Sequence, residues 1–264
     1  METAAYIFAI FGLFLLPLTL YIFPNFYLKI RENKKYDLSF RYFLFFLVLI
    51  TEIWFYLNHL YLDDKQHAWQ HWQNYFWLEF CNFSAVTIMI LLIKPNKLFM
   101  DCTLPLGLIG PCATVFFPAN LSNMSFTNYW YWQDMFGHIT IFFSYLFLYT
   151  YGYTKTRFDK TFIQRSIVYT TIIGLGIEVY NLGFGTSFGY KAVAEIFIGQ
   201  QKEIYYFLFV ISWIWPLLFT IYYLIVWYFK PIYSLELKQK INDSWFEKIS
   251  KKIVRQSRKI KQKQ

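Results

Sequence analysis

Long apolar segments recur along the whole chain and alternate with short polar connections. A helix needs roughly 20 apolar residues to cross about 30 Å of hydrocarbon. Backbone groups in lipid must be paired within the segment, and the alternation typical of barrel strands is absent. The pattern therefore predicts an all-α membrane bundle of about seven transmembrane helices, near residues 5–23, 41–59, 75–93, 98–117, 134–153, 163–182 and 204–229.

The positions of Lys and Arg predict how this bundle is oriented. If the seven helices are correct, 22 of the 25 basic residues lie on one side of the membrane, and only Lys65, Lys191 and Lys202 lie on the other. Basic loops stay on the cytoplasmic side. The N-terminus is therefore predicted outside and the C-terminus cytoplasmic, in a multi-pass protein of the cell membrane.

The C-terminal tail, residues 230–264, carries eleven basic residues against three acidic ones. Its apolar residues recur every four positions, at Ile241, Trp245, Ile249 and Ile253. This is typical of an amphipathic basic helix that lies on anionic lipid headgroups. Nucleic-acid binding is the alternative, but the net charge of +9 is concentrated in this tail and is explained by the membrane. Membrane lipids are therefore the predicted partners, and no nucleic acid is expected.

Polar residues inside the predicted spans cluster at one depth, within about 10 Å of the outer interface. Ionisable residues are costly in lipid and by default face the bundle interior at a functional site. The cluster predicts a shared cavity that opens outward; the alternative is a set of isolated hydrogen bonds between helices. Its members are Glu52, Glu79, Cys81, Asn82, Asp134, His138, Glu178 and Asn181.

Two of these residues have the chemistry of a catalyst. Cys81 is a candidate nucleophile, and His138 on another helix at similar depth is a candidate general base. Glu52 or Glu178 is expected to orient the second nitrogen of His138. Against this, a buried cysteine is more often a small apolar residue than a nucleophile.

A metal site has little support in the sequence. His67 and His71 are four residues apart, but they lack a nearby third ligand in a segment rich in tryptophan. That segment is better explained as an interfacial aromatic belt. No metal and no cofactor are expected.

Several short motifs resemble those of the YwaF-like family of bacterial multipass membrane proteins. They are the segment from Leu78 to Ala85 around the cysteine, the segment Gly107 to Gly110 with Pro118, the segment Phe136 to His138, and the segment Asn181 to Tyr190. Phe76 and Trp77 stand where that family usually has a Leu-Pro pair, and Ser187 stands where it often has asparagine.

The resemblance implies lipid chemistry. A vertebrate relative is regarded as a phospholipid acyltransferase that uses a Cys and a His, and the matching residues here are Cys81 and His138. A phospholipid is then the implied substrate of an acyltransferase or lipid hydrolase. Two alternatives stay open: a small-solute transporter that uses the intramembrane carboxylates, and a non-enzymatic membrane assembly protein.

Overall fold

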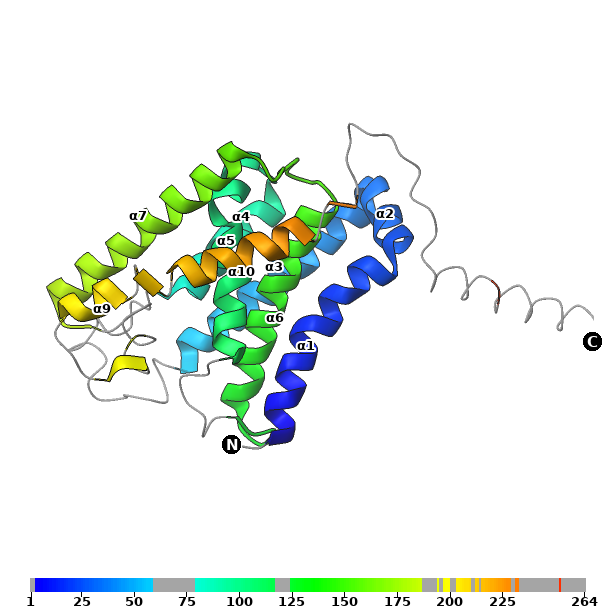
Figure 1. The fold of residues 1–264 in the computed structure, drawn as a ribbon. Helices are drawn as coiled ribbons and strands as arrows, with labels where there is room; N and C mark the ends of the chain where they lie inside the picture. Colours follow the sequence, from blue (N-terminus) through cyan, green and yellow to red (C-terminus); the bar gives the residue numbers. More distant parts are fainter. Residues whose placement is uncertain are drawn as a thin grey trace, which may run out of the picture.

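The computed structural model describes three long stretches of the chain, residues 3–58, 79–116 and 124–186, and short pieces beyond them (194, 197–199, 203–209, 212–213, 215–228, 231–232 and 252). The described stretches are built from helices, with no strand among them. The helices are α1 (Thr3–Ile22), α2 (Pro24–Glu32), α3 (Lys34–Asn58), α4 (Phe80–Ile93), α5 (Lys97–Phe116), α6 (Tyr129–Thr150), α7 (Lys160–Phe184), α9 (Glu203–Phe209) and α10 (Trp215–Tyr228). Their arrangement is drawn in Figure 1.

Four of these helices, α1, α3, α5 and α7, are long and apolar enough to cross a membrane. Helix α4 is apolar but shorter, with 14 residues from Phe80, and residues 75–78 of the predicted span lie outside the described residues. The predicted last span, 204–229, is described as two helices, α9 and α10. The multi-pass helical class is thus confirmed, while seven crossings and the orientation of the termini stay predictions. Nearly all of the predicted basic tail lies outside the described residues.

Helix α6 is the central helix of the bundle. It packs against α1, α3, α4 and α5, and every residue from Thr140 to Thr150 is buried. Because its sides meet other helices rather than lipid, α6 can carry more polar side chains than a lipid-facing span.

Buried tyrosines attach α6 to its neighbours. The hydroxyl of Tyr131 donates to the carbonyl of Ala5 at 2.7 Å, and that of Tyr151, directly after α6, donates to Leu20 at 2.6 Å. Each tyrosine buries a large ring and satisfies its single polar group against backbone. Both ends of α1 are thereby held along α6, and the two helices run side by side in Figure 1.

A third tyrosine, Tyr145, joins α6 to α4 and α5. Its hydroxyl lies 2.6 Å from Oγ1 of Thr87 on α4. Its ring lies flat against Gly107 on α5, where an added Cβ would come within 2.1 Å of a ring carbon. Only a glycine lets the two helices approach this closely, so Gly107 fixes how α5 packs on α6.

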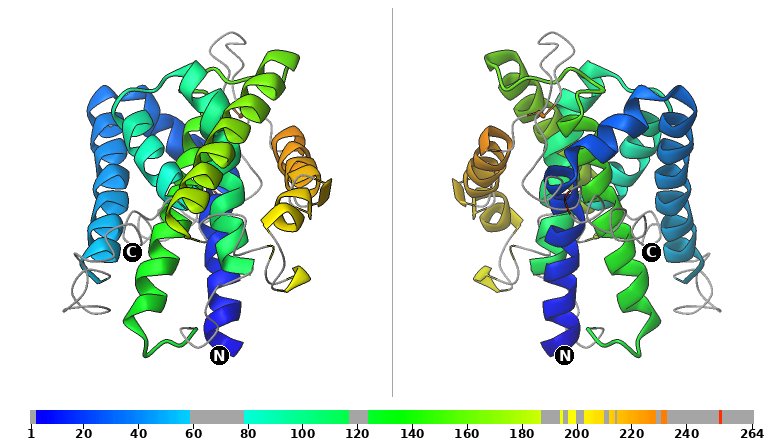
Figure 2. Two further views of the ribbon diagram at one scale, coloured as in Figure 1. Left: turned by 90° about the vertical axis from the view of Figure 1, so that its left-hand side faces the viewer. Right: turned by 90° about the vertical axis from the view of Figure 1, so that its right-hand side faces the viewer.

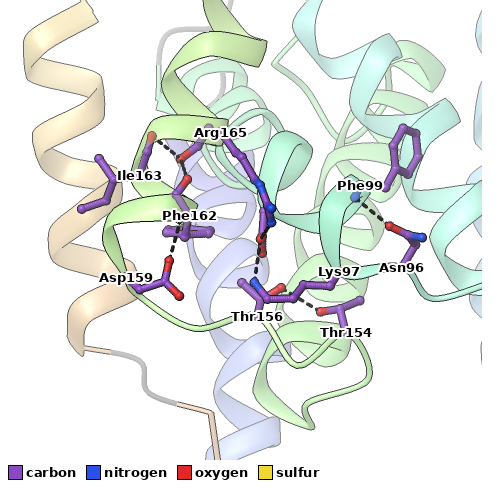
Figure 3. Close-up of polar contacts among 11 residues, drawn as sticks. Asn96, Lys97, Phe99, Thr154, Thr156, Asp159, Phe162, Ile163 and Arg165 are labelled. Carbon is purple, nitrogen blue, oxygen red and sulfur yellow. Dashed lines mark hydrogen bonds and ion pairs between the residues drawn. The ribbon is translucent and has the colours of Figure 1, made fainter.

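The basic residues at the ends of α5 and α7 share one buried carboxylate. Asp101 is fully buried and accepts from Lys97 at 2.7 Å and from Arg165 at 3.0 Å. Figure 3 shows Lys97 and Arg165 approaching one another from these two helices. Asp101 and Arg165 therefore form an interhelical ion pair, and this pair closes the end of the bundle opposite to the site described next.

Candidate functional site

Three helices bring the predicted site residues together. Cys81 and Asn82 lie in the first turn of α4, directly after the extended residue Glu79. Helix α6 carries His138, and α3 carries Glu52. Helices α3, α4 and α6 pack against one another pairwise. The site is therefore formed where the end of α3, the start of α4 and the first half of α6 meet.

Cys81 and His138 lie close enough for the thiol and the imidazole to interact. In this structure the thiol donates instead to Oδ1 of Asn82, at 3.4 Å. Nε2 of His138 is buried and has no hydrogen-bond partner among the described residues. An unpaired imidazole nitrogen thus lies beside a thiol, as a general base beside its nucleophile.

Asp134 holds the other side of the imidazole. Nδ1 of His138 lies 2.7 Å from the backbone carbonyl of Asp134 and 3.1 Å from its carboxylate Oδ1. Both partners are acceptors, so Nδ1 carries a proton. The sequence analysis expected Glu52 or Glu178 in this role. The structure places Asp134 there instead, because residues four apart on one helix lie side by side.

Glu52 lies close to Cys81 and His138, but it is on the neighbouring helix α3 and not on α6 with Asp134. Its carboxylate is near enough to His138 to interact by charge. It is held there by a close crossing of α3 and α6, in which an added Cβ on Gly137 would lie 3.6 Å from Thr51. At the same crossing, Gln133 donates to the carbonyl of Thr51 at 3.3 Å. Glu52 is thus a carboxylate at the edge of the Cys81 and His138 contact.

The backbone around Cys81 is shaped by its place at a helix start. The first N–H groups of a helix, here those of Phe80 and Cys81, have no acceptor within the helix. The N-cap residue Glu79 makes no side-chain hydrogen bond to cap the helix, and its carboxylate faces Cys81 within range of its charge. Gly110 of α5 packs against this turn, where an added Cβ would lie 3.6 Å from the Cys81 nitrogen. The Cys81 thiol therefore lies at the positive end of the α4 dipole.

A groove of about 330 Å³ runs between α3 and α4 beside this site. Its polar end includes Asn82, the acceptor of the Cys81 thiol, and Tyr56, which is hydrogen bonded to Asn82. Glu52 also lines the groove, and the other residues of its wall are apolar. The groove is lined by Leu49, Glu52, Ile53, Tyr56, Leu57, Asn82, Val86 and Met89.

Two predicted site residues are not brought to Cys81 and His138. Glu178 and Asn181 lie on α7, which packs chiefly against α5. Asn181 Oδ1 accepts from Thr186 at 2.9 Å, and its carbonyl accepts from the N–H of Gly185, the residue that ends the helix. In the described part of the chain, no contact joins either residue to the pair. In place of the single cavity expected to include all eight residues, the structure forms a smaller site between α3, α4 and α6.

Tyr56 and the groove itself were not predicted from sequence. Tyr56 follows Glu52 by four residues, so the helical period places it on the same face. That signal was available in the sequence, but the groove depends on how α3 is rotated against α4. The histidines His67 and His71 lie outside the described residues. Within those residues, no cluster of His, Cys, Asp and Glu could hold a metal ion.

Comparison with known proteins gives one match. Residues 1–235 match the model of the TMEM164 family. No curated protein and no solved structure matches the chain. This match does not confirm the YwaF-like grouping that the short motifs suggested. It covers every described helix, including all residues of the site, and the chain therefore belongs to the TMEM164 family, a family of transmembrane proteins.

Proposed function

We propose that the protein is a membrane enzyme that transfers or hydrolyses the acyl group of a phospholipid, with Cys81 as nucleophile and His138 as general base. The observation that carries this proposal is the order Asp134, His138, Cys81: an oriented imidazole whose unpaired nitrogen adjoins a thiol. This is the arrangement of groups that activates a nucleophile in unrelated hydrolases.

In the first half of the reaction, Cys81 takes up the acyl group. A rotation of the thiol from Asn82 toward His138 lets Nε2 accept the proton, and the thiolate then attacks the ester carbonyl. The carbon–oxygen ester bond breaks, and the departing alkoxide takes the proton from Nε2. The products are a thioester on Cys81 and a lysolipid, and the imidazole is neutral again.

In the second half, the acyl group leaves the cysteine. An acceptor hydroxyl, or water, gives its proton to Nε2 of His138 and attacks the thioester carbonyl. The carbon–sulfur bond breaks, and the thiolate recovers the proton from the imidazolium. With a lipid hydroxyl as acceptor the result is acyl transfer, and with water it is hydrolysis.

The start of α4 is suited to stabilise the negative charge that develops on the carbonyl oxygen in both steps. The N–H groups of Phe80 and Cys81 have no intrahelical acceptor and point toward the N-terminal end of the helix, where the dipole is positive. Donors of this kind stabilise a tetrahedral oxyanion, and the loss of one such donor costs roughly a hundredfold or more in rate. Asp134 stabilises the imidazolium that forms in the same step.

The proposal includes the membrane arrangement expected from sequence. With seven crossings and a cytoplasmic tail on anionic headgroups, Cys81 and His138 lie near the outer face of the cell membrane. Ester carbonyls of outer-leaflet lipids lie at the same level. The site would then meet its substrate laterally, from within the bilayer.

Purified protein in mixed micelles with a labelled phospholipid tests this proposal. Cys81→Ala should abolish acyl release and transfer, because no other group replaces the thiolate. Cys112→Ala is the matched control: this cysteine is partly buried on α5 and packs against the core, and its removal should leave turnover within about twofold of wild type. Undiminished turnover in Cys81→Ala would contradict the proposed mechanism.

A further inference from the structure

We infer that the groove between α3 and α4 binds the acyl chain that is to be cleaved, with its carbonyl beside Cys81 and its methyl end near Leu49 and Met89. This inference rests on the proposed function and adds where the lipid chain lies and in which direction it runs.

The wall of the groove is almost wholly apolar, and its polar end is defined by two residues, Tyr56 and Asn82. Helices α3 and α4 run in opposite directions, and Tyr56 near the end of α3 is hydrogen bonded to Asn82 at the start of α4. Seven residues deeper along each helix, roughly 10 Å away, lie Leu49 and Met89. Glu52 lies between the two ends, three residues from Leu49 and four from Tyr56, so only Tyr56 and Asn82 mark the polar end.

The polar end adjoins the nucleophile. Asn82 lines the groove and also accepts the proton of the Cys81 thiol at 3.4 Å. Glu52 lines the groove and interacts with His138 by charge. A carbonyl at this end would therefore lie within reach of the thiol, while hydrocarbon filled the rest.

The groove opens sideways along a membrane-crossing helix. Ile53 and Leu57 on α3 and Val86 on α4 are about half exposed, at 49%, 50% and 52%. Helix α3 is long and apolar enough to cross a membrane, so the medium at these side chains is lipid rather than water. Figure 2 shows α3 and α4 together on the side of the molecule opposite to α10. The occupant that this medium supplies is a lipid chain.

The size and direction of the groove fit one acyl chain. Its volume of about 330 Å³ is at the low end of the range for small-molecule pockets. It therefore accommodates part of a single chain and not a whole two-chain phospholipid. In the proposed orientation, its polar end is toward the outer interface and its apolar end toward the membrane centre, which is how an outer-leaflet lipid is oriented.

A photoreactive lipid tests the groove without any chemistry at the cysteine. The probe is a phosphatidylcholine with a diazirine at the methyl end of one palmitoyl chain, bound to the Cys81→Ala protein in vesicles. After irradiation, the label should map by mass spectrometry to peptides that contain Leu49 and Met89. Excess unlabelled phosphatidylcholine with the same chains should compete.

Two matched variants make the result specific. Met89→Trp in the Cys81→Ala background fills the apolar end of the groove and should lower the labelling roughly tenfold, as expected when a site is overfilled. Ile90→Trp adds the same bulk one position along, at a residue that is 49% exposed and does not line the groove. It should leave labelling unchanged. Equal labelling in the two variants, or label elsewhere on the bundle, would overturn the inference.

The two proposals fail in different ways. If wild-type protein forms no acyl adduct while the probe still labels Leu49 and Met89 peptides, the groove binds a chain and the proposed enzymatic function is wrong. If the adduct forms while Met89→Trp binds and labels as wild type does, the enzymatic function stands and the groove assignment is wrong.

Discussion

The Cys81 thiol has two neighbours that compete for its proton. It donates to Oδ1 of Asn82 at 3.4 Å, while Nε2 of His138 lies unpaired beside it. A rotation of the thiol turns its S–H bond away from the amide oxygen of Asn82 and toward Nε2 of His138. Asn82 would then hold the thiol in its resting direction, and the lipid that enters the groove along Asn82 would favour the rotation.

Asp134 is predicted to be a positioning residue for His138. In Asp134→Asn the backbone carbonyl 2.7 Å from Nδ1 remains, but the charge that stabilises the imidazolium is lost. Because the carboxylate is partly exposed, the effect should be smaller than in a fully buried triad: turnover should fall roughly 10- to 100-fold. The KM for phospholipid should be unchanged, since the groove is intact.

Steady-state kinetics in mixed micelles, over a range of pH, measure this prediction. Asp134→Glu should recover part of the turnover, and the Asn variant should show an altered pH profile. A raised KM at normal turnover would show that Asp134 acts in substrate binding and not on His138.

At the scale of helices, close approaches between elements hold the site in place. Gly137 lets α6 approach Thr51 of α3, next to Glu52, and Gly110 lets α5 approach the first turn of α4. The tightest approach is that of Gly107 to the ring of Tyr145, whose hydroxyl also meets Thr87 on α4. The packing of α4, α5 and α6 therefore depends on one glycine and one tyrosine.

Gly107→Ala is predicted to destabilise the bundle. The new methyl group would overlap the Tyr145 ring and force α5 away from α6, at a cost of about 1–3 kcal/mol. Gly176→Ala on α7 is the control, since nothing lies within 4 Å of an added Cβ there, and it should be neutral or stabilising by up to about 1 kcal/mol. Thermal unfolding in detergent measures both. Equal melting temperatures for the two variants would contradict this account of the packing.

The same scale explains what could be predicted from the sequence. The predicted depth placed Cys81 and His138 at one level, but it placed Glu178 and Asn181 there too, and only the packing of α4 on α6 separates them. The helical period predicts the contact of Asp134 with His138, although Glu52 or Glu178 was the residue expected to orient the imidazole. The start of α4 at Phe80 lacks a capping signal, because Glu79 makes no side-chain cap. The groove cannot be derived from hydropathy, since α3 and α4 are apolar on several faces and their rotation depends on packing.

At the scale of the whole molecule, the two ends of the bundle differ. One end is held by ion pairs to buried Asp101 and by Arg41, which donates to the carbonyl of Leu92 at 2.6 Å at the end of α4. The other end carries an unpaired imidazole nitrogen, a thiol and a groove that opens to lipid. The proposed enzyme would use this division, with one end of the bundle fixed and the other open to a lipid. The same division is less suited to a solute carrier. A carrier needs polar groups along its path at both ends, and the Asp101 carboxylate at the closed end is already bound by Lys97 and Arg165.

The central claim is that Cys81 carries the acyl group during turnover, and the most direct measurement is to trap that intermediate. Purified wild-type protein is incubated with phospholipid labelled in the acyl chain and quenched in acid, and the peptide from Glu79 to Lys94 is analysed by mass spectrometry. The account predicts an acyl mass on Cys81 that hydroxylamine removes, a much slower appearance of that mass in His138→Ala, and an unchanged yield in Cys112→Ala. An active protein that acquires no acyl mass on Cys81, or acquires it equally fast without His138, would contradict the account.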